Sequence, residues 1–352
     1  MSVRWNLNMT RSLVVLLTWL AVPALVCGCS AGKAEAPGAE SPAGGSKAVQ
    51  PDRSESDKAA PVHAEPNAVE PARVEPPQSK AGQAKPAAEP NDLKLDSAAL
   101  FHGKCAEIFR SFVDGRGMVN YEGLRRKRLE LRAVLDQYGN PGRKEYESWS
   151  RQDKIAFWIN VYNLQKLSIV ADNYPIEPSS RILTIYWGPN SIRHIEERIT
   201  RHKFLVMDEE FTFVGIEKRF FRGEFDEPRI FFALSSACQS SPPLRNEPYC
   251  GRRLNEQLDD QTSRFLFNPL GFRIDKEKQK VYLSALFQQS SYGKEFAEKF
   301  AIDRKFKDFP AATRAVLNFI TNYVSKQDVS FLETGNYTIE YMTYDWTIND
   351  GS

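Results

Sequence analysis

A change of composition near Asp92 limits where this chain can fold. Residues 30–90 are built mainly from Ala, Pro, Glu, Ser, Gly and Lys and contain no Trp, Tyr, Phe, Leu or Ile. Such a segment cannot bury enough apolar surface to offset the entropy that is lost on folding. We therefore expect a disordered linker over residues 30–92, with a spacer role favoured over a binding role, and one globular domain over residues 93–352.

The first 29 residues have the pattern of a secretory signal. Arg4 and Arg11 supply positive charge, an apolar run covers residues 13–26, and Gly28 precedes Cys29. The run is too short for a membrane-spanning helix. The pattern resembles a bacterial lipoprotein signal, in which Cys29 is acylated and becomes the mature N-terminus. Ordinary cleavage of a soluble secreted protein is the alternative.

The residue after the cysteine is Ser30, which by the usual retention rule for such lipoproteins favours the outer membrane. The resemblance therefore implies a lipid anchor in the bacterial cell envelope, with the domain facing the periplasm. The formal net charge of +2, with acidic and basic residues interspersed, gives no footprint for nucleic acid. The basic cluster at residues 125–128 favours a solvated helix face over a site for an anionic partner. The expected partners are the membrane, through the anchor, and an unidentified protein or small molecule.

Apolar periodicity and turn residues predict the elements of the domain. Helices are expected over residues 97–112, 124–138, 155–170, 191–201, 216–221, 254–267 and 311–324, and strands over 182–187, 204–207, 211–214, 229–234, 272–274, 281–283 and 337–344. Helices and strands mix without a regular βαβ rhythm, so we predict an α+β fold with a mainly antiparallel sheet packed by several helices. Ser150 and Asp153 form a capping box, and the apolar helix after it should be central and buried.

Two asparagines lie on this apolar helix, Asn160 and Asn163. A buried amide must find hydrogen-bond partners or destabilise the fold by about 1–3 kcal/mol. Either the two side chains bond to neighbouring backbone and fix the helix in place, or they line a polar pocket.

A second candidate is the stretch at residues 229–244, where a β-favouring run leads into small hydroxyl residues, Cys238 and a double proline. A nucleophilic Cys238 would need a base, and His194 or His202 could supply it, although their spacing implies no contact. The alternative is a disulfide between Cys238 and Cys250, which in an oxidising compartment would close a short loop.

Metal and cofactor sites find no support in the sequence. The histidines of the domain are scattered, and no His-x-x-x-His, Cys-x-x-Cys or phosphate-cradling Gly loop is present. We expect no metal and no cofactor. Cys105 falls on an apolar helical stripe and should be a buried small hydrophobe.

Several segments together resemble the domain-of-unknown-function family 547 (DUF547). Residues 156–163, Ala-Phe-Trp-Ile-Asn-Val-Tyr-Asn, are similar to the family's hallmark Ala-Phe-Trp-Ile-Asn-x-Tyr-Asn. Further similar segments follow in the family's order, at residues 216–222, 226–234, 254–258 and 344–349. The resemblance covers residues 119–349 and implies the family's fold, but the family has no settled activity to lend.

The chain departs from the family pattern at four positions. The family typically has cysteines where this chain has Ser236 and Ser241, and histidines where it has Lys218 and Phe231. If those residues form a thiol-based site in relatives, this chain lacks it. Ser236 could replace a cysteine nucleophile, yet the bases that would activate it are missing too.

We therefore expect a non-catalytic, lipid-anchored envelope domain that binds a partner or ligand through a pocket. The candidate pocket residues are Trp158, Asn160, Asn163, Arg222, Arg229 and Asp345. The alternative is a cysteine-type hydrolase or transferase that uses Cys238 with His194 or His202. A structural role in the envelope is a third hypothesis.

Overall fold

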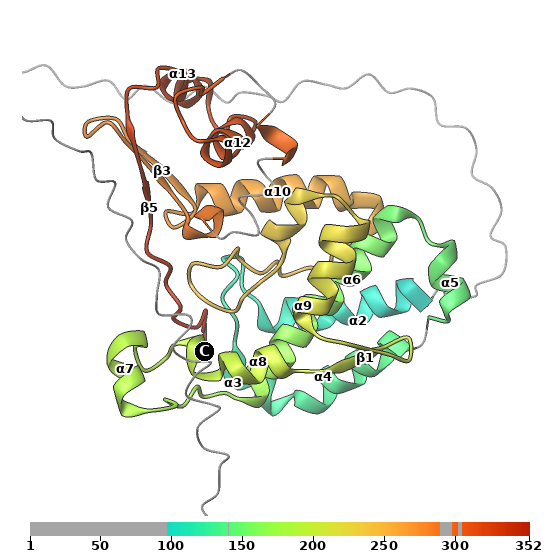
Figure 1. Ribbon diagram of the computed structural model, residues 1–352. Helices are drawn as coiled ribbons and strands as arrows, with labels where there is room; N and C mark the ends of the chain where they lie inside the picture. The colour runs from blue at the N-terminus through green and yellow to red at the C-terminus, as the bar shows by residue number, and fades with distance from the viewer. Residues whose placement is uncertain (1–96, 140, 289–297, 302–304) are drawn as a thin grey trace, which may run out of the picture. The chain divides into compact units, whose positions relative to one another are not determined.

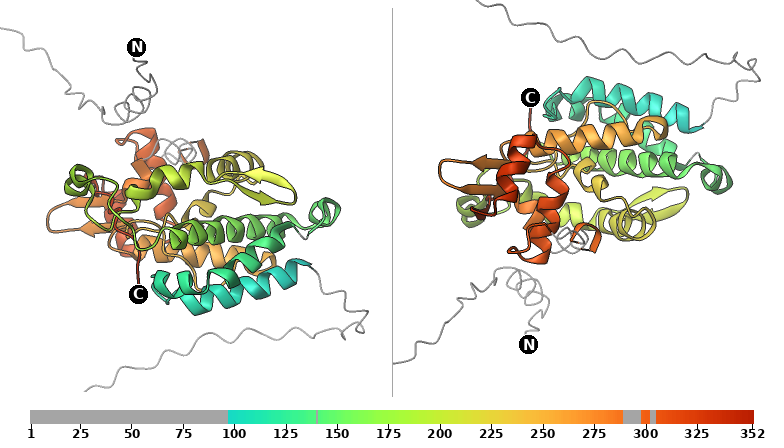
Figure 2. Two further views of the ribbon diagram at one scale, coloured as in Figure 1. Left: turned by 90° about the horizontal axis from the view of Figure 1, so that it is seen from below. Right: turned by 90° about the horizontal axis from the view of Figure 1, so that it is seen from above.

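Helices and two small sheets make up the α+β fold, which confirms the predicted fold class (Figure 1, Figure 2). The computed structural model describes residues 97–139, 141–288, 298–301 and 305–352. All of them belong to one compact unit, Lys85–Ser352. The predicted signal, the Cys29 lipidation site and the linker lie outside the described residues.

Helix α6 (Arg151–Asp172) is the central element, as predicted. The Ser150 hydroxyl accepts a hydrogen bond from the backbone N–H of Asp153, so the capping box starts the helix. Side chains are buried on every face of α6 because other helices surround it. The helices that pack against it include α2 (Ser97–Phe112), α3 (Tyr121–Arg126), α4 (Arg128–Leu135), α8 (Glu196–Arg201) and α9 (Phe213–Ile216).

Most predicted helices form, with changes at their ends. The helix expected over residues 124–138 is divided into α3, α4 and the 3₁₀ turn η1 (Asp136–Gly139). Helix α10 (Leu254–Phe267) has its predicted bounds, and α12 (Ala311–Ile320) ends earlier than expected. Elements that the sequence pattern did not indicate are α5 (Arg143–Ser148), α13 (Lys326–Glu333) and the 3₁₀ turns η5 (Gly251–Arg253) and η6 (Ala285–Gln288).

The strands form two separate sheets rather than one. Strands β1 (Phe204–Val206) and β2 (Glu209–Phe211) make an antiparallel hairpin, as do β3 (Phe272–Asp275) and β4 (Lys280–Leu283). Strand β5 (Thr338–Tyr341) pairs with β4 in parallel, so this sheet is mixed. The parallel pairing is possible because the long connection through α12 and α13 brings the chain back in the same direction.

Two predicted strands are wrong throughout, and a third, expected over residues 211–214, is displaced: β2 ends at Phe211, and residues 213–214 belong to α9. Residues 182–187 belong to helix α7 (Arg181–Trp187), and residues 229–234 belong largely to the 3₁₀ helix η4 (Pro228–Ala233). Both segments are rich in β-branched and aromatic residues, but each begins with a helix cap. The Ser180 hydroxyl accepts from the N–H of Leu183, and the Glu227 carboxylate accepts from the N–H of Arg229. Capping and tertiary packing therefore override the local strand preference.

The apolar side chains form two cores. The larger core surrounds α6, and the smaller one lies among α10, α12 and the β3–β4–β5 sheet. Helix η4 connects them, because Phe232 belongs to the smaller core while its neighbours Phe231 and Ala233 belong to the larger one. The position of η4 is thus fixed from both sides.

The segment at residues 344–350, which we call the C-terminal strap, joins three distant parts of the domain. Its backbone pairs with Val119 after α2, with Asn190 and Ile192 before α8, and with residues 237–240. The Asn349 side chain adds a hydrogen bond from its amide nitrogen to the carbonyl of Gly117 and accepts one from the Tyr121 hydroxyl. The strap therefore holds the loop that contains Cys238 against the helical body.

Candidate functional site

The two amides of α6 bond to backbone, which is the structural alternative considered above. The Asn160 amide donates to the carbonyl of Tyr249 at 2.8 Å and accepts from the Tyr249 N–H at 2.9 Å. One turn along, Asn163 donates to the carbonyl of Ala233 at 2.8 Å and accepts from the N–H of Ser235 at 3.0 Å. Each amide thus both donates to and accepts from the backbone of one loop, as a neighbouring β-strand would. These bonds fix the position of the loop against α6.

Trp158 fixes a third segment. Its ring stacks on Phe220 with centroids 3.9 Å apart, and its indole N–H donates to the Tyr146 hydroxyl at 2.8 Å. Phe220 lies in the π-helix η3 (Glu217–Glu224), so α6 positions this element through Trp158. Short π-helical segments are frequent at functional sites because they redirect the side chains that follow.

The loop at residues 235–241, which we call the serine loop, is closed by hydrogen bonds. The Ser241 hydroxyl accepts from the N–H of Ser236 at 2.7 Å, and the Ser235 hydroxyl accepts from the N–H of Ala237. Ala237 adopts a φ of 61°, a left-handed conformation that these bonds and the strap maintain. The Ser240 hydroxyl accepts from the N–H of Asp345 at 2.8 Å. The hydroxyl groups of this loop therefore hold its own backbone and the strap.

Cys238 lies in this loop but lacks the environment of a nucleophile. Its side chain is 2% exposed, and its thiol bonds to the Tyr344 hydroxyl at 3.4 Å. Burial raises the pKa of this thiol to about 11, although the hydrogen bond with Tyr344 acts in the opposite direction. A thiol with this pKa is protonated at neutral pH and is a weak nucleophile.

Neither candidate base is directed at Cys238. His194 binds the carbonyl of Gly188 with Nε2 and accepts from the N–H of Ser179 with Nδ1. His202 shares a hydrogen bond between Nε2 and the amide oxygen of Gln165, and its ring packs on Phe213. Both imidazoles therefore serve the packing of their own segments, and the predicted Cys–His pair is not assembled.

The disulfide predicted between Cys238 and Cys250 is not formed in this structure, where both residues and Cys105 are free thiols. Cys250 lies just before η5, and its N–H donates to the side chain of Gln257 at 2.9 Å. The thiol of Cys238 instead faces Tyr344. Cys105 is fully buried in the larger core, as predicted.

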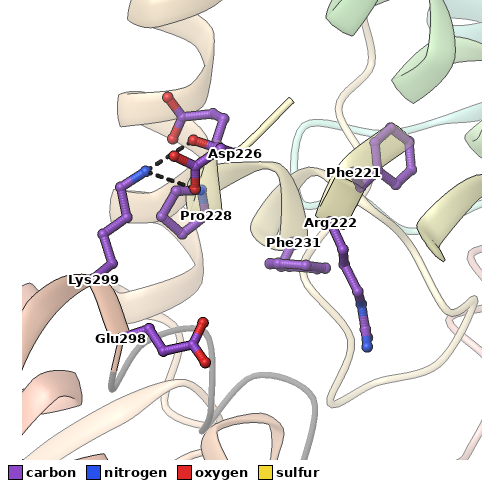
Figure 3. Close-up of a pocket in the computed structure, with 8 residues that line it drawn as sticks. Phe221, Arg222, Asp226, Pro228, Phe231, Glu298 and Lys299 are labelled. Atoms are coloured by element: carbon purple, nitrogen blue, oxygen red, sulfur yellow. Dashed lines mark hydrogen bonds and ion pairs between the residues drawn. The ribbon is translucent and has the colours of Figure 1, made fainter. Parts of the chain in front are cut away.

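A cavity of about 390 Å³ opens where η3 leads into η4 (Figure 3). Such a volume is in the range of small-molecule sites. Figure 3 shows Phe231 between two groups of charged side chains, with Arg222 on one side and Glu298 and Lys299 on the other. The lining residues are Phe221, Arg222, Asp226, Glu227, Pro228, Phe231, Glu298 and Lys299.

The charges of this cavity are arranged around an apolar surface. The Arg222 guanidinium lies 5.7 Å from the centroid of the Phe231 ring and 3.9 Å from the carboxylate of Glu217. Lys299 donates to the backbone carbonyl of Asp226 at 2.8 Å and pairs with its carboxylate at 3.3 Å. The cavity can therefore offer an apolar surface with positive and negative groups at its edges.

Glu227 gives the cavity a negatively charged side chain in a fixed position. Burial alone would raise the pKa of its carboxyl, but hydrogen bonds and the charge of Arg229 outweigh burial and leave the pKa lowered. Two nitrogen atoms of the Arg229 guanidinium bond to the two oxygens of Glu227, at 2.9 and 2.8 Å, and a third bonds to Asp259. Glu227 is thus charged at neutral pH and held in one orientation.

Of the six predicted pocket residues, Arg222 lines this cavity. Arg229 does not line the cavity but holds its lining residue Glu227 by hydrogen bonds. Trp158 positions η3, which supplies part of the lining, through its contact with Phe220. Asn160, Asn163 and Asp345 are not among its lining residues; the carboxylate of Asp345 caps a turn by accepting from the N–H of Thr347. The sequence reasoning missed Asp226, Glu227 and Pro228, although an acidic, proline-containing turn beside a run of aromatic residues was a readable signal.

Sequence reasoning also missed Lys166, the charged residue within the apolar run of α6. Its side chain is 7% exposed, and its ammonium group lies 4.0 Å from the centroid of the Phe213 ring. Burial lowers the pKa of Lys166 to about 8, although the negative charge of Glu217 opposes this change. A buried cation therefore lies in the core between η3 and the serine loop.

Within the described part of the chain, no three His, Cys, Asp or Glu side chains gather as a metal-ion site would require. Among the same residues, none of the helices combines the length and the apolar character needed to cross a bilayer.

Comparison with known proteins supports a DUF547 domain. Residues 146–266 match a family described as protein of unknown function, DUF547. No curated protein and no solved structure matches the chain. The match is shorter than the expected 119–349. It contains α6, η3, η4, the serine loop and all but the last residue of α10, but not Glu298 and Lys299 of the cavity. At the two positions where the resemblance led us to expect histidines, Lys218 is exposed on η3 and Phe231 lines the cavity.

Proposed function

We propose that this protein is a lipid-anchored, non-catalytic binding protein of the cell envelope, whose DUF547 domain takes its ligand in the cavity between η3 and η4. The proposed anchor is an acylated Cys29, at the outer membrane and facing the periplasm. The linker at residues 30–92 would separate the domain from the anchor.

The cavity is the observation that carries this proposal. It combines the apolar faces of Phe231 and Pro228 with the guanidinium of Arg222. An apolar pocket with a few oriented polar groups is the usual form of a small-molecule site. The thiol of Cys238 is buried and protonated, and His194 and His202 bond to groups other than this thiol. These observations argue against the cysteine-type hydrolase or transferase.

The chemistry of the lining suggests the ligand class. A guanidinium binds a carboxylate with two parallel hydrogen bonds, and the 3% of Phe231 that is exposed offers, beside Pro228, a small contact for an apolar group. The proposed ligand therefore carries an aromatic or apolar group next to a carboxylate, as the end of a peptide does.

A pair of matched small molecules tests this proposal by calorimetric titration of the purified protein. N-acetyl-phenylalanine carries the carboxylate, and N-acetyl-phenylalaninamide lacks it. We expect the acid to bind at least about tenfold more tightly than the amide, and Arg222→Gln to remove this preference. Equal binding of both compounds, or binding of neither, contradicts the proposed ligand class.

Arg219→Gln is the matched control for this experiment. Arg219 lies on the same π-helix and packs on Phe220, but it pairs with Glu209 outside the cavity. We expect this variant to keep the preference for the acid.

The proposed anchor is tested separately, by mass spectrometry of the N-terminal peptide from protein purified out of its native membrane. An unmodified Cys29 there would contradict it.

A further inference from the structure

Helix α7 presents an apolar face to solvent. Ile182, Ile185 and Tyr186 are 69%, 82% and 79% exposed. Their spacing of three and four residues places them on one face of the helix. None of the seven residues of α7 is buried, and Figure 1 shows the helix standing out from the body of the domain. Large apolar side chains gathered in this way mark an interaction surface.

The opposite end of α7 is attached to the domain. The Trp187 ring lies 5.4 Å from the ring of His194, and the guanidinium of Arg193 lies 5.0 Å from Trp187 and 5.2 Å from Trp346. Arg193 therefore stacks on rings from both α7 and the C-terminal strap. These contacts fix the direction of the helix while its apolar face stays outside the core.

Basic side chains without acidic partners accompany this face. Arg181 is exposed at the first position of α7 and has no ion-pair partner within the described residues. Arg125 and Arg128 are likewise exposed and unpaired in the part of the chain that the structure describes, and they flank the α3–α4 junction. Leu129, beside them, is 72% exposed. Figure 1 draws α7, α3 and α4 along the same lower edge of the domain, which the left view of Figure 2 faces.

We propose that this edge of the domain docks on the surface of an anionic lipid bilayer. Ile182, Ile185 and Tyr186 enter the interface between headgroups and acyl chains, where aromatic and large aliphatic side chains are favourable. Arg181, Arg125 and Arg128 contact the phosphate groups. An anionic bilayer thus provides both an apolar environment for the exposed apolar side chains and negative charge for the unpaired arginines.

This inference rests on the proposed lipid anchor in one respect. A contact of three apolar side chains and a few arginines is weak in isolation. An anchor at Cys29 would keep the domain beside the membrane, so that a weak contact is occupied much of the time. The docked state would hold the domain at a defined orientation to the bilayer.

Hydrogen exchange on the full chain tests the proposal. The protein is reconstituted on vesicles of phosphatidylethanolamine and phosphatidylglycerol and, for comparison, on vesicles of phosphatidylcholine alone. We expect short-pulse exchange of residues 178–190 to be slowed at least about fivefold on the anionic vesicles, and residues 124–130 to be slowed with them. Equal exchange on both kinds of vesicle overturns the proposal and leaves a protein partner as the occupant.

Variants separate a lipid contact from a general effect of the vesicles. In Ile182→Ser/Ile185→Ser/Tyr186→Ser, we expect the protection of residues 124–130 to be lost as well, because the whole edge then leaves the membrane. Phe267→Ser is the control, since Phe267 is 69% exposed and belongs to α10, a helix that Figure 1 draws above this edge. Protection that survives the triple change overturns the proposed role of α7.

The failure of this proposal and the failure of the proposed anchor are distinguishable. The mass of the N-terminal peptide reports on Cys29 in the same samples. A lipidated chain whose α7 exchanges equally on both vesicles keeps its anchor but contradicts the docking surface. An unmodified chain whose α7 is protected on anionic vesicles contradicts the anchor and supports the docking surface.

Discussion

The cavity lies where η3 leads into η4 and the serine loop follows η4 in the chain, and the two regions use polar residues in different ways. In the serine loop, hydroxyl and amide groups bond to backbone, and the Cys238 thiol is 2% exposed. In the cavity, charged side chains surround an open volume of about 390 Å³. The first arrangement stabilises the fold, and the second can receive a ligand.

The comparison shows why residue type alone is a weak guide to a site. Cys238, Ser236 and the double proline are the residues that chemistry would select from the sequence, yet they form a closed structural loop. The cavity is built from aromatic and charged residues that are common on any protein surface. What distinguishes them is their arrangement around the π-helix, which Trp158 positions from α6.

The largest effect is expected at Asn163, which holds the serine loop. Asn163→Leu leaves the carbonyl of Ala233 and the N–H of Ser235 buried without their partner. Each lost group costs about 1–3 kcal/mol, so we expect the free energy of unfolding to fall by about 4 kcal/mol. Urea denaturation followed by tryptophan fluorescence measures this change.

Arg222→Gln, in the cavity, is the matched comparison for that measurement. Arg222 is about one-third exposed, and interactions of partly exposed charges contribute little to stability, so we expect a loss below about 1 kcal/mol. If Arg222→Gln proves as destabilising as Asn163→Leu, the division between a structural loop and a binding cavity is wrong.

A slightly smaller effect, of opposite sign, is expected at Lys166 behind the serine loop. Its pKa in the folded state is lowered from 10.5 to about 8, so the folded protein disfavours the charged form. Stability from this residue is present above pH 10.5 and is lost as the pH falls through 8. Lys166→Met should therefore raise the free energy of unfolding at pH 7 by up to about 3 kcal/mol.

The pH dependence of the Lys166→Met effect identifies its cause. The gain over the wild-type protein should shrink as the pH rises from 8 to 10.5, and denaturation curves at several pH values measure it. Lys154→Met, at a half-buried position in the first turn of the same helix, is the control and should change stability by less than about 1 kcal/mol at pH 7. A gain at Lys166 that is constant with pH would point to packing instead.

The third effect concerns the reactivity of Cys238. With its pKa raised to about 11, this thiol should react with iodoacetamide at pH 7.5 at least about a hundredfold more slowly than an ordinary thiol. Half-buried Cys250 should be alkylated first, which peptide mass spectrometry can score. Rapid labelling of Cys238 would restore the nucleophile hypothesis. A Cys238–Cys250 disulfide in purified protein would contradict the free thiol state of both cysteines.

Much of the helical scaffold was predictable because its signals are local. Ser150 and Asp153 cap α6, and α10 has its predicted bounds because its apolar spacing lies within one continuous segment. The strand predicted at η4 was wrong for a non-local reason. Phe231 and Phe232 pack into different cores, and Asn163 binds the carbonyl of Ala233 from another helix. Local β-preference contains no information about such partners.

The cavity could not be predicted for a related reason. Its walls come from residues 221–231 and 298–299, which are far apart in the sequence, so a signal in the first segment does not show that the second lies beside it. For the same reason, the sequence left two roles open for Asn160 and Asn163. The sequence indicated that these amides are buried, but it did not indicate which loops they bind.

The C-terminal strap also sets an order of events during synthesis. The bonds that seal Cys238 and Ser240 join them to Tyr344 and Asp345, which are 106 and 105 positions later. At ordinary rates of translation, these partners are made roughly five to twenty seconds after the cysteine. A nascent chain can already contain α6 and the family's hallmark stretch while its thiol is still uncovered. The period of greatest sensitivity to oxidants therefore falls before the strap docks, and the finished fold covers this thiol.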